Sequence, residues 1–513
     1  MEAVTAIASA WRLARTLATF ERTGAMRVAL EAMEAPRAIR IAARVIGWPL
    51  SVIGLTGDRK MPPVVRALTA LGPAYIKFGQ ILSTRPDVVG EDLARQMRVL
   101  QDKLPPFPMS QAKAEIAREL GAPVEELFAA FDDPVAAASI AQVHRAELKG
   151  TRREVAVKIL RPGIERAFLR DVKAFYFAAD FIEFLAPVTR RLRPRAVIEH
   201  FDSVVQGELD LRLEASAASE FRANTEEDEG FRVPGVVWHL SERRVMTTEW
   251  VRGINMGETD ELVAAGNDPK RLAVSIVQSF LKHALRDGFF HADMHQGNLK
   301  VGPDGGIIAL DFGIMGRIDA YTRRVYAEII MGFLRRDYQR VAEVHFEAGY
   351  VPGDRDVQLF AQTLRSIGEP IFGQAADKIS MARLLAHLFD VTERFGMETR
   401  TELILLQRTM VVVEGVGRSL DPHMNMWEVA RPVVEDYIRS NLGPRAVLRT
   451  MRETVMVLSR FGPRLPALTE RLLVEAGGQG TAPPQPPGRI QGRWLLLGVA
   501  LGVGMAVLVP RLF

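Results

Sequence analysis

The chain has 513 residues, of which 48% are hydrophobic and 25% are charged, with 66 basic and 62 acidic side chains. A chain this long exceeds a single hydrophobic core and predicts roughly two to four domains or lobes, and its ordinary globular composition argues against disorder. It contains no cysteine, which excludes disulfides, thiolate metal sites and a cysteine nucleophile. The small net charge is spread too thinly to indicate a nucleic acid partner, and we expect none.

Residues 1–130 are predicted to form a helical N-terminal extension, because apolar residues recur at helical spacing between prolines. The predicted breaks fall at Pro36, Pro49, Pro62, Pro63, Pro105 and Pro106. The first fifty residues contain no lysine but seven arginines: Arg12, Arg15, Arg22, Arg27, Arg37, Arg40 and Arg44. Such a segment is typical of an interfacial amphipathic helix or a transit-like segment, and equally of an exposed arginine-rich face on a packed helix.

Residues 131–253 are predicted to form a small kinase-like N-lobe. Strands are expected over 139–148 and 154–160, where apolar residues alternate or form buried runs. Two long helical stretches follow, 163–185 and 196–224, and strands return over 236–240 and 244–250. Glu249 lies near the end of the last strand, where the chain leaves the sheet, and is assigned to the cofactor-binding residues.

Residues 254–475 are predicted to form a helical C-lobe, interrupted only around 298–313. A small sheet followed by a mostly helical lobe, with polar motifs at the junction, is the outline of a bilobal protein kinase. A nucleotide would lie in the cleft between the lobes.

The end of the chain is predicted to be a linker, 476–493, followed by a membrane anchor, 494–513. The linker is rich in proline and glycine, and the apolar run 494–509 is flanked by Arg493 and Arg511. This run is slightly shorter than the ~20 residues that span a bilayer comfortably, but the last residues extend it. Gly498 and Gly502 form a small-xxx-small pair that allows helices to pair, so a homodimer is a further expectation. The predicted fold class is α+β: a bilobal protein-kinase-like fold with a helical N-terminal extension and a C-terminal transmembrane helix.

The strongest chemical signal is the segment that begins at His291 and ends at Gly313. Asp293 is expected to orient or deprotonate an acceptor, and Asn298 and Asp311 are expected to bind Mg²⁺. Gly313 is expected to allow the backbone turn after Phe312. His291 is interpreted as a structural hydrogen-bonding residue, and His295 is left without a role. The order and spacing predict a phosphoryl-transfer site.

Lys158 lies in an apolar strand, Val-Ala-Val-Lys, where a charge requires a partner. It is expected to contact the nucleotide phosphates while a helical carboxylate holds it; the alternative is a strand-edge lysine facing solvent. The carboxylates available are Glu208, Asp210 and Glu214. Asp210 and Glu214 would share one face of a continuous helix, with Glu208 rotated away from it.

An alanine-rich loop stands where protein kinases carry a glycine-rich phosphate loop. Its residues Ala136, Ala137 and Ala138 adopt positive φ less readily than glycine, which predicts a stiffer loop and a different nucleotide pose. Ser139 and Gln142 are expected to supply polar contacts to the nucleotide.

Four motifs in order resemble the UbiB-like atypical kinase family, which is linked to ubiquinone (coenzyme Q) biosynthesis. They are Lys77-Phe-Gly79-Gln80, the alanine-rich loop, Glu208-Leu-Asp210, and the segment from His291 to Gly313. The resemblance covers roughly residues 65–320 and is specific, because the motifs follow the family order.

The resemblance implies that the Lys77 segment folds over the active site, with Lys77 facing Glu208 and Asp210. Lys77 then joins Asp293 and Lys158 as a catalytic residue. The residues Gly79, Gln80, Glu208 and Asp210 become regulatory, and Glu214 becomes the partner of Lys158. ATP or ADP with Mg²⁺ is the implied cofactor set. Without the resemblance, Lys77 could equally be a lysine on a helix surface.

Two departures from ordinary protein kinases are visible in the sequence. Ala292 replaces the arginine that usually precedes the catalytic aspartate, so a phosphorylated activation loop would lack its cation. No Ala-Pro-Glu follows Asp311-Phe-Gly, and a helical pattern resumes by about Tyr321. We therefore expect the platform that docks a peptide to be missing.

Three functions follow from these observations. The first is a membrane-anchored ATPase or small-molecule phosphotransferase that supports quinone-lipid synthesis. The second is a protein kinase of a biosynthetic complex, and the third is a lipid-binding scaffold that uses nucleotide as a switch. The expected partners are membrane lipids, quinone intermediates and quinone-biosynthesis proteins. The expected location is the bacterial inner membrane, with the catalytic domain in the cytoplasm.

Overall fold

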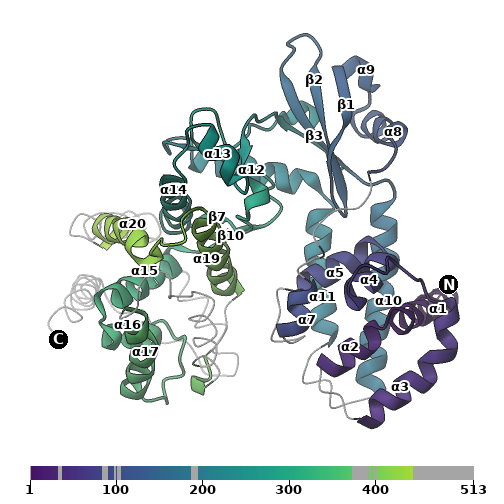
Figure 1. Ribbon diagram of the computed structural model, residues 1–513, viewed down its shortest axis with the longest axis horizontal. Helices are drawn as coiled ribbons and strands as arrows, with labels where there is room; N and C mark the ends of the chain where they lie inside the picture. The colour runs from purple at the N-terminus through teal and green to yellow at the C-terminus, as the bar shows by residue number, and fades with distance from the viewer. Residues whose placement is uncertain are drawn as a thin grey trace, which may run out of the picture. The chain divides into compact units, whose positions relative to one another are not determined.

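The computed structural model describes residues 2–32, 37–83, 91–97, 100, 106–185, 194–372, 391, 394–397 and 401–442. Met1–Arg439 form one compact unit, and Ser440–Phe513 form a second, of which residues 440–442 are described. The predicted linker, 476–493, and the predicted anchor, 494–513, lie outside the described residues. Everything below concerns the first unit (Figure 1).

The described part of the N-terminal extension is helical up to Leu127, and a strand begins at Phe128, inside the range predicted to be helical. Its elements are α1 (Glu2–Thr23), α2 (Ala25–Ala32), α3 (Arg37–Leu50), the 3₁₀ turn η1 (Ser51–Ile53), α4 (Pro63–Leu71), α5 (Pro73–Ser83) and α7 (Glu91–Met97). A small core between α2, α4, α5 and α7 includes Leu68, Ile76 and Met97. The predicted break at Pro49 is one residue early: α3 continues through it and ends at Leu50, since a proline close to a helix end disturbs few backbone hydrogen bonds.

The N-lobe is built on an antiparallel sheet of four strands in the order β1-β2-β3-β5. The strands are β1 (Phe128–Ala137), β2 (Ala141–Leu148), β3 (Glu154–Leu160) and β5 (Val245–Glu249). Helices α8 (Met109–Leu120) and α9 (Val124–Leu127) precede β1, and Ile116 of α8 packs against the sheet with Val157 and Val245. The strand predicted over 236–240 is instead the 3₁₀ turn η3 (Trp238–Leu240), with a single bridge from Val236 to Thr248.

Three helices link the extension to the sheet: α10 (Ile164–Leu185), α11 (Pro194–Glu208) and α12 (Leu211–Asn224). The continuous helix predicted over 196–224 is wrong, because it breaks after Glu208. Asp210 adopts extended backbone angles and its side chain accepts a hydrogen bond from the Arg212 N–H. A residue that caps a helix N-terminus in this way cannot also continue the preceding helix.

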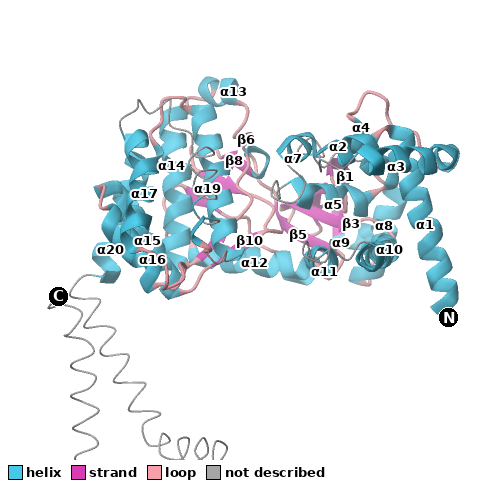
Figure 2. Cartoon of the chain, turned by 90° about the horizontal axis from the view of Figure 1, so that it is seen from below, coloured by secondary structure: helices cyan, strands magenta, loops and turns pink. Residues whose placement is uncertain are grey.

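The C-lobe combines short strands with long helices (Figure 2). One sheet has the order β4-β9-β8-β6, and β7 pairs separately with β10. The strands are β4 (Phe231–Arg232), β6 (Ile254–Asn255), β7 (Phe289–His291), β8 (Leu299–Val301), β9 (Ile307–Ala309) and β10 (Met315–Arg317). The helices are α13 (Thr259–Ala264), α14 (Pro269–Lys282), the π-turn η4 (His283–Asp287), η5 (Gln296–Asn298), α15 (Ala320–Arg335), α16 (Tyr338–Glu347), α17 (Val357–Phe372), α19 (Thr401–Leu420) and α20 (Met426–Leu442).

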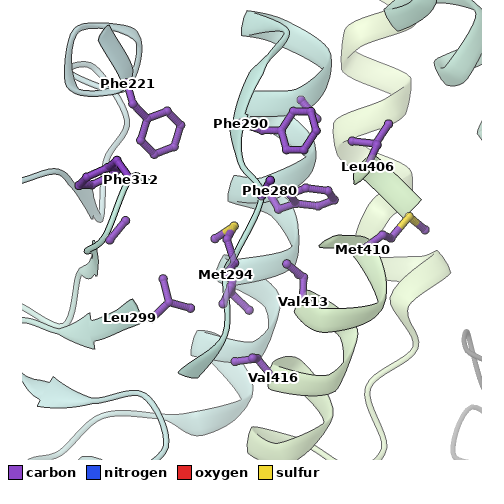
Figure 3. Close-up of a cluster of buried hydrophobic side chains, with 14 of the residues drawn as sticks. Phe221, Phe280, Phe290, Met294, Leu299, Phe312, Leu406, Met410, Val413 and Val416 are labelled. Atoms are coloured by element: carbon purple, nitrogen blue, oxygen red, sulfur yellow. The ribbon is translucent and has the colours of Figure 1, made fainter. Parts of the chain in front are cut away.

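The main hydrophobic core lies directly beneath the segment that carries the catalytic motif. Met294 is fully buried and packs beside α14 and α19, close to Val413 (Figure 3). Phe221 of α12 stacks at an angle against Phe312, with ring centroids 6.0 Å apart. Both ends of the motif are therefore anchored in the same hydrophobic core.

One part of the predicted fold class is corrected. No helix in the described part of the chain is long and apolar enough to cross a membrane, so the transmembrane helix is removed from the fold class. The longest described helices instead carry charges that they use within the fold; Arg12 of α1, for example, pairs with Asp171 of α10. The kinase-like α+β architecture with a helical extension remains.

Candidate active site

Lys158 occupies the centre of the site. Its neighbours in β3, Val157 and Ile159, face the N-lobe core, so the Lys158 side chain leaves the opposite face of the strand. Its Nζ lies 2.7 and 2.8 Å from the two carboxylate oxygens of Glu214 and 3.4 Å from Oδ2 of Asp311. The structure thus brings together the strand lysine, the helical carboxylate and the aspartate that the sequence predicted as a set.

These charges alter one another's titration. Burial alone would lower the pKa of Lys158, but the carboxylates of Asp311 and Glu214 outweigh it and raise that pKa above its usual range. The ammonium of Lys158, in turn, holds the pKa of Asp311 below its usual range. Burial raises the pKa of Glu214, and the charge of Lys158 opposes that rise. The single positive charge of Lys158 therefore faces two carboxylates. Because negative charge is in excess, an added cation would stabilise this arrangement.

Asp311 has a strained backbone. Its φ is +57°, in the left-handed region that favours glycine. The predicted role of Gly313 is corrected, because φ is positive at Asp311 and not at Gly313. Gly313 instead allows a close approach: its N–H lies 3.3 Å from Oδ1 of Asp311, and a Cβ at this position would lie 3.2 Å from the same oxygen. The Asp311 side chain is 52% exposed, so its carboxylate is accessible to a ligand.

Asp293 is held in place by hydrogen bonds to His291 and to Asn298. The backbone N–H of Asp293 donates to Nδ1 of His291 at 3.1 Å, and Nε2 of His291 donates to the Leu310 carbonyl at 2.9 Å. Burial lowers the pKa of His291, so it stays neutral and serves as the hydrogen-bonding residue that the sequence indicated. Nδ2 of Asn298 donates to the Asp293 carbonyl at 3.0 Å, which presents the amide oxygen to a cation.

This donor set fits a magnesium ion. Asn298 and Asp311 offer an amide oxygen and a carboxylate, the ligand types that Mg²⁺ prefers. Among the residues that the structure describes, no group of three His, Asp or Glu side chains converges as a ready metal cage. Mg²⁺ commonly binds through one or two protein groups and completes its shell with phosphate and water oxygens.

Helix α19 supports the segment from His291 to Asn298. The sequence analysis did not predict this support. Thr409 donates from Oγ1 to the Ala292 carbonyl at 3.1 Å, and Gln296 donates to Ser419 at 2.5 Å. Arg408 is close enough to Asp293 to feel its charge: desolvation lowers the pKa of the Arg408 guanidinium, and the Asp293 carboxylate partly opposes that change. No local pattern marks these residues, because each contact joins positions more than a hundred residues apart.

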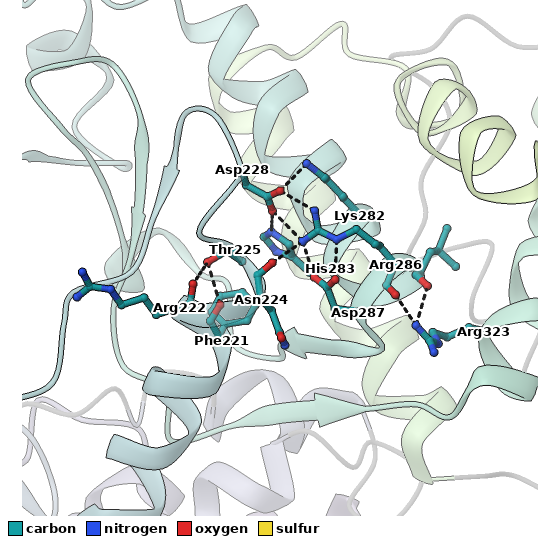
Figure 4. Close-up of polar contacts among 11 residues, drawn as sticks. Phe221, Arg222, Asn224, Thr225, Asp228, Lys282, His283, Arg286, Asp287 and Arg323 are labelled. Carbon is teal, nitrogen blue, oxygen red and sulfur yellow. Dashed lines mark hydrogen bonds and ion pairs between the residues drawn. The ribbon is translucent and has the colours of Figure 1, made fainter. Parts of the chain in front are cut away.

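A second unpredicted feature is a polar network around Asp228 (Figure 4). Asp228 accepts from His283 at 3.0 Å and from Arg286 at 2.6 Å, and it pairs with Lys282 at 2.5 Å. Burial alone would raise the pKa of Asp228, but these bonds hold it well below its usual range. Arg286 also donates to the Asn224 carbonyl at the end of α12. The network therefore fastens α12 to the π-turn η4 that leads into β7.

The alanine-rich loop is a tight turn between β1 and β2. Ala136 and Ala137 pair with β2 as strand residues, and the Ala138 carbonyl accepts hydrogen bonds from Arg161. Ser139 is buried. Oε1 of Gln142 accepts from the Phe107 N–H at 2.9 Å, and its Nε2 lies 2.8 Å from the ring of His144. The Gln142 side chain therefore joins the extension to β2, and its contact with nucleotide remains a prediction.

The resemblance implied that Lys77 faces both Glu208 and Asp210. In the structure Lys77 forms an ion pair with Glu208 at 2.5 Å, and its charge contributes to the lowered pKa of Asp311. Asp210 is instead engaged by Arg212, at 2.9 and 2.7 Å.

Gly79 and Gln80 hold the extension together. A Cβ at Gly79 would lie 2.5 Å from a Leu100 methyl group, and Nε2 of Gln80 donates to the Leu100 carbonyl at 2.8 Å. Their regulatory role remains a prediction.

Glu249 uses its side chain within the N-lobe. Its carboxylate accepts from the Gly235 N–H at 2.9 Å, and it pairs with Arg153 at 2.8 Å and Arg222 at 3.4 Å. Its contact with the nucleotide remains a prediction.

Comparison with known proteins agrees with this geometry. A family model described as the ABC1 atypical kinase-like domain matches residues 99–345, and one described as the UbiB helical domain matches residues 364–425. A solved structure, the complex of Rv3197 with erythromycin from Mycobacterium tuberculosis, is similar with a TM-score of 0.50 and 26% identity, covering 69% of this chain and 90% of that one. The fold and the site define an atypical kinase-like protein.

Curated relatives narrow this class. A protein named "Probable protein kinase UbiB" from Marinobacter nauticus is 39% identical over 419 residues, covering 81% of this chain and 76% of the relative. A protein of the same name from Aliivibrio fischeri is 40% identical over 407 residues, covering 78% and 75%. One from Xanthomonas campestris is 39% identical over 455 residues, covering 86% and 81%. The chain belongs to the UbiB family.

Proposed function

We propose that this protein is an ATP-dependent phosphotransferase or ATPase that requires Mg²⁺ and supports ubiquinone biosynthesis. The observation that carries the proposal is the contact of Lys158 with both Glu214 and Asp311. In phosphoryl-transfer sites a lysine of this kind positions the phosphates, and the aspartate beside it binds the metal. Membership of the UbiB family supports the assignment to ubiquinone biosynthesis.

Each residue has a distinct task in this proposal. Lys158 contacts the α and β phosphates, and Glu214 prevents its side chain from turning away. Asp293 orients the acceptor hydroxyl or water and accepts its proton. Asn298 and Asp311 would hold Mg²⁺, which would neutralise the phosphate charge when bound.

The acceptor is proposed to be a small molecule or water. After Phe312 the chain forms β10 and enters α15 at Ala320, and every residue of this short connection is described. A protein kinase places its activation loop and peptide-docking segment here. The seven residues from Gly313 to Asp319 leave no length for either, which supports an acceptor other than an extended peptide.

Quinone intermediates are apolar, membrane-dissolved compounds, so we place the proposed activity at the cytoplasmic side of the bacterial inner membrane. Membrane lipids, quinone intermediates and quinone-biosynthesis proteins are its proposed partners. This part of the proposal rests on the family and on the chemistry of the intermediates.

The deciding experiment replaces Asp311 by Asn in the full chain. We expect the purified variant to lose Mg²⁺-dependent ATP binding and phosphate release, and cells that depend on it to accumulate quinone intermediates. Asp354→Asn, at a carboxylate that is 76% exposed, serves as the matched control and should behave as wild type. Normal ubiquinone levels in the Asp311→Asn cells would overturn the proposal.

A protein kinase acting on a biosynthetic complex is the second candidate, because the relatives are named as protein kinases. It predicts transfer of labelled phosphate from ATP to a partner protein, and loss of that transfer in Asp311→Asn. Phosphate release without any labelled protein favours the ATPase.

A further inference from the structure

The N-terminal extension exposes a row of large apolar side chains. Ile41, Val45, Trp48 and Val52 are 64%, 67%, 75% and 78% exposed. Their spacing of four, three and four residues places them on one face of α3 and the adjoining turn η1. A contiguous apolar row of this kind marks a binding surface more often than scattered exposed residues do. We call these four residues the α3 face.

Contacts with α1, made by Gly47 of α3 and by the residues that follow the helix, hold the α3 face outward. Gly47 lies against α1, where a Cβ would be 3.1 Å from Glu21. Arg22 of α1 donates to the Val52 and Gly54 carbonyls, at 3.1 and 2.7 Å. The Leu55 N–H donates to Thr19 at 3.1 Å. These contacts fix the helix on α1, so the exposed row does not result from a loosely attached segment.

The charge beside the α3 face has a single sign. Arg37 and Arg44 are exposed and Arg40 is half-buried. The sequence has no Asp or Glu from Ala35 to Gly57, and the nearby Glu21 lies on the side that packs against α1. The surface therefore combines an apolar row with positive charge from a stretch of sequence that has no acidic residue of its own.

We propose that the α3 face, with Arg37, Arg40 and Arg44, docks on the surface of a bilayer that contains anionic phospholipids. Tryptophan favours the boundary between headgroups and acyl chains, and arginine is attracted to anionic headgroups. A helix of 14 residues is too short to span a bilayer and would lie in its surface. This inference deepens the proposed function by naming the surface that meets the membrane.

Charge complementarity selects lipid over a second copy of the chain. Two identical α3 faces would bring two sets of three arginines together without a carboxylate between them, which opposes self-association. An anionic bilayer has negatively charged headgroups that attract the three arginines. It also has an apolar interior that can accommodate the side chains of the α3 face.

The test uses the absence of cysteine from the chain. Val45→Cys in the full chain is labelled with an environment-sensitive fluorophore and mixed with vesicles of phosphatidylcholine alone or with phosphatidylglycerol. Trp238→Cys is the matched control, since Trp238 is a 51% exposed aromatic residue of the N-lobe. The label reports on its own position, so lipid contacts made elsewhere in the chain do not mimic the result.

We expect the emission at position 45 to shift to the blue with phosphatidylglycerol vesicles, and the emission at position 238 to stay unchanged. Neutralising Arg37, Arg40 and Arg44 to Gln should lower partitioning of the labelled protein about 100-fold. An unchanged spectrum at position 45, or an equal shift at 238, would overturn the inference. So would a shift without vesicles that grows with protein concentration, because that identifies a protein interface.

The same samples separate this inference from the proposed function. Asp311→Asn should leave the shift at position 45 intact, and Trp48→Asp should leave phosphate release without vesicles intact. If the wild-type protein releases no phosphate but its shift at position 45 is present, the proposed activity fails and the docking surface stands. If phosphate release is normal and the shift is absent, the docking surface alone fails.

Discussion

Lys77 of α5 and Glu208, the last residue of α11, form an ion pair at 2.5 Å in which the side chains are only 16% and 11% exposed. This pair connects the N-terminal extension to the helices that carry the Lys158 partner. Removing one charge from a buried pair is costly, because the other is left without a counter-charge.

Glu208→Gln should therefore lower the free energy of unfolding by about 3 kcal/mol, measured by urea unfolding. Adding Lys77→Met should restore most of that loss, because the unpaired ammonium is then removed. The exposed pair of Lys113 and Glu125, at 2.7 Å, is the control, and Glu125→Gln should have no measurable effect. Equal losses in the single and double variants would show that the pair is not coupled.

Gly79→Ala tests how tightly the extension is packed. The added methyl group would lie 2.5 and 2.6 Å from methyl groups of Leu100 and Leu68, so the helices must separate. We expect a loss of about 1–3 kcal/mol in unfolding free energy. Gly415→Ala is the control in α19, where a Cβ meets nothing within 4 Å, and it should not destabilise the protein. Equal stability of both variants would contradict the close packing.

Asp293→Asn tests the proposed base. The backbone bonds of Asp293 to His291 and Asn298 do not use its carboxylate, so the segment should keep its shape. ATP binding should persist, while phosphate release should fall about 10²- to 10⁴-fold. Calorimetric titration and a phosphate assay measure the two quantities separately. Unchanged turnover would remove Asp293 from the chemistry.

The buried ring of His345 should make the free energy of unfolding depend on pH. Burial lowers its pKa to about 4, while its ring bonds to the Val341 carbonyl at 2.7 Å. As the pH falls from about 6.5 towards 4, the unfolded chain binds a proton that the folded state does not, so stability is lost in this window. Between pH 7 and pH 5 the loss should be about 2 kcal/mol.

His345→Phe keeps a ring beside Phe360 but removes the titrating group. Its unfolding free energy should change less between pH 7 and pH 5 than that of wild type, even though the variant is less stable overall. The same slope in both proteins would show that His345 does not cause the dependence.

The grouping of the predicted catalytic and metal-binding residues could be predicted because they lie close together in the sequence. Asp293, Asn298 and Asp311 are separated by a short hairpin, so their order alone indicates their chemistry. A charge in an apolar strand predicted a carboxylate partner for Lys158, and the family resemblance implied that this partner is Glu214. The strands β2, β3 and β5 were predicted from alternation and length.

Other features depend on tertiary contacts that leave no local signal. The break before α12 was missed because the residues on both sides favour helix, and only the cap made by Asp210 ends the periodicity. Thr409 contacts Ala292 across 117 positions. Asp228 lies in an acidic run whose members look alike in sequence, and only burial distinguishes it.

The short gap between α11 and α12 has a mechanical consequence. Glu208 and Glu214 hold the two lysines of the site, yet only Leu209 and Asp210 separate the helices that carry them. A movement of the extension that displaces Glu208 would also displace the first turn of α12. The Glu214 carboxylate would then change its position relative to Lys158. The N-terminal extension and the proposed nucleotide site are thus mechanically coupled. A partner that binds the extension can change the affinity of the site for nucleotide.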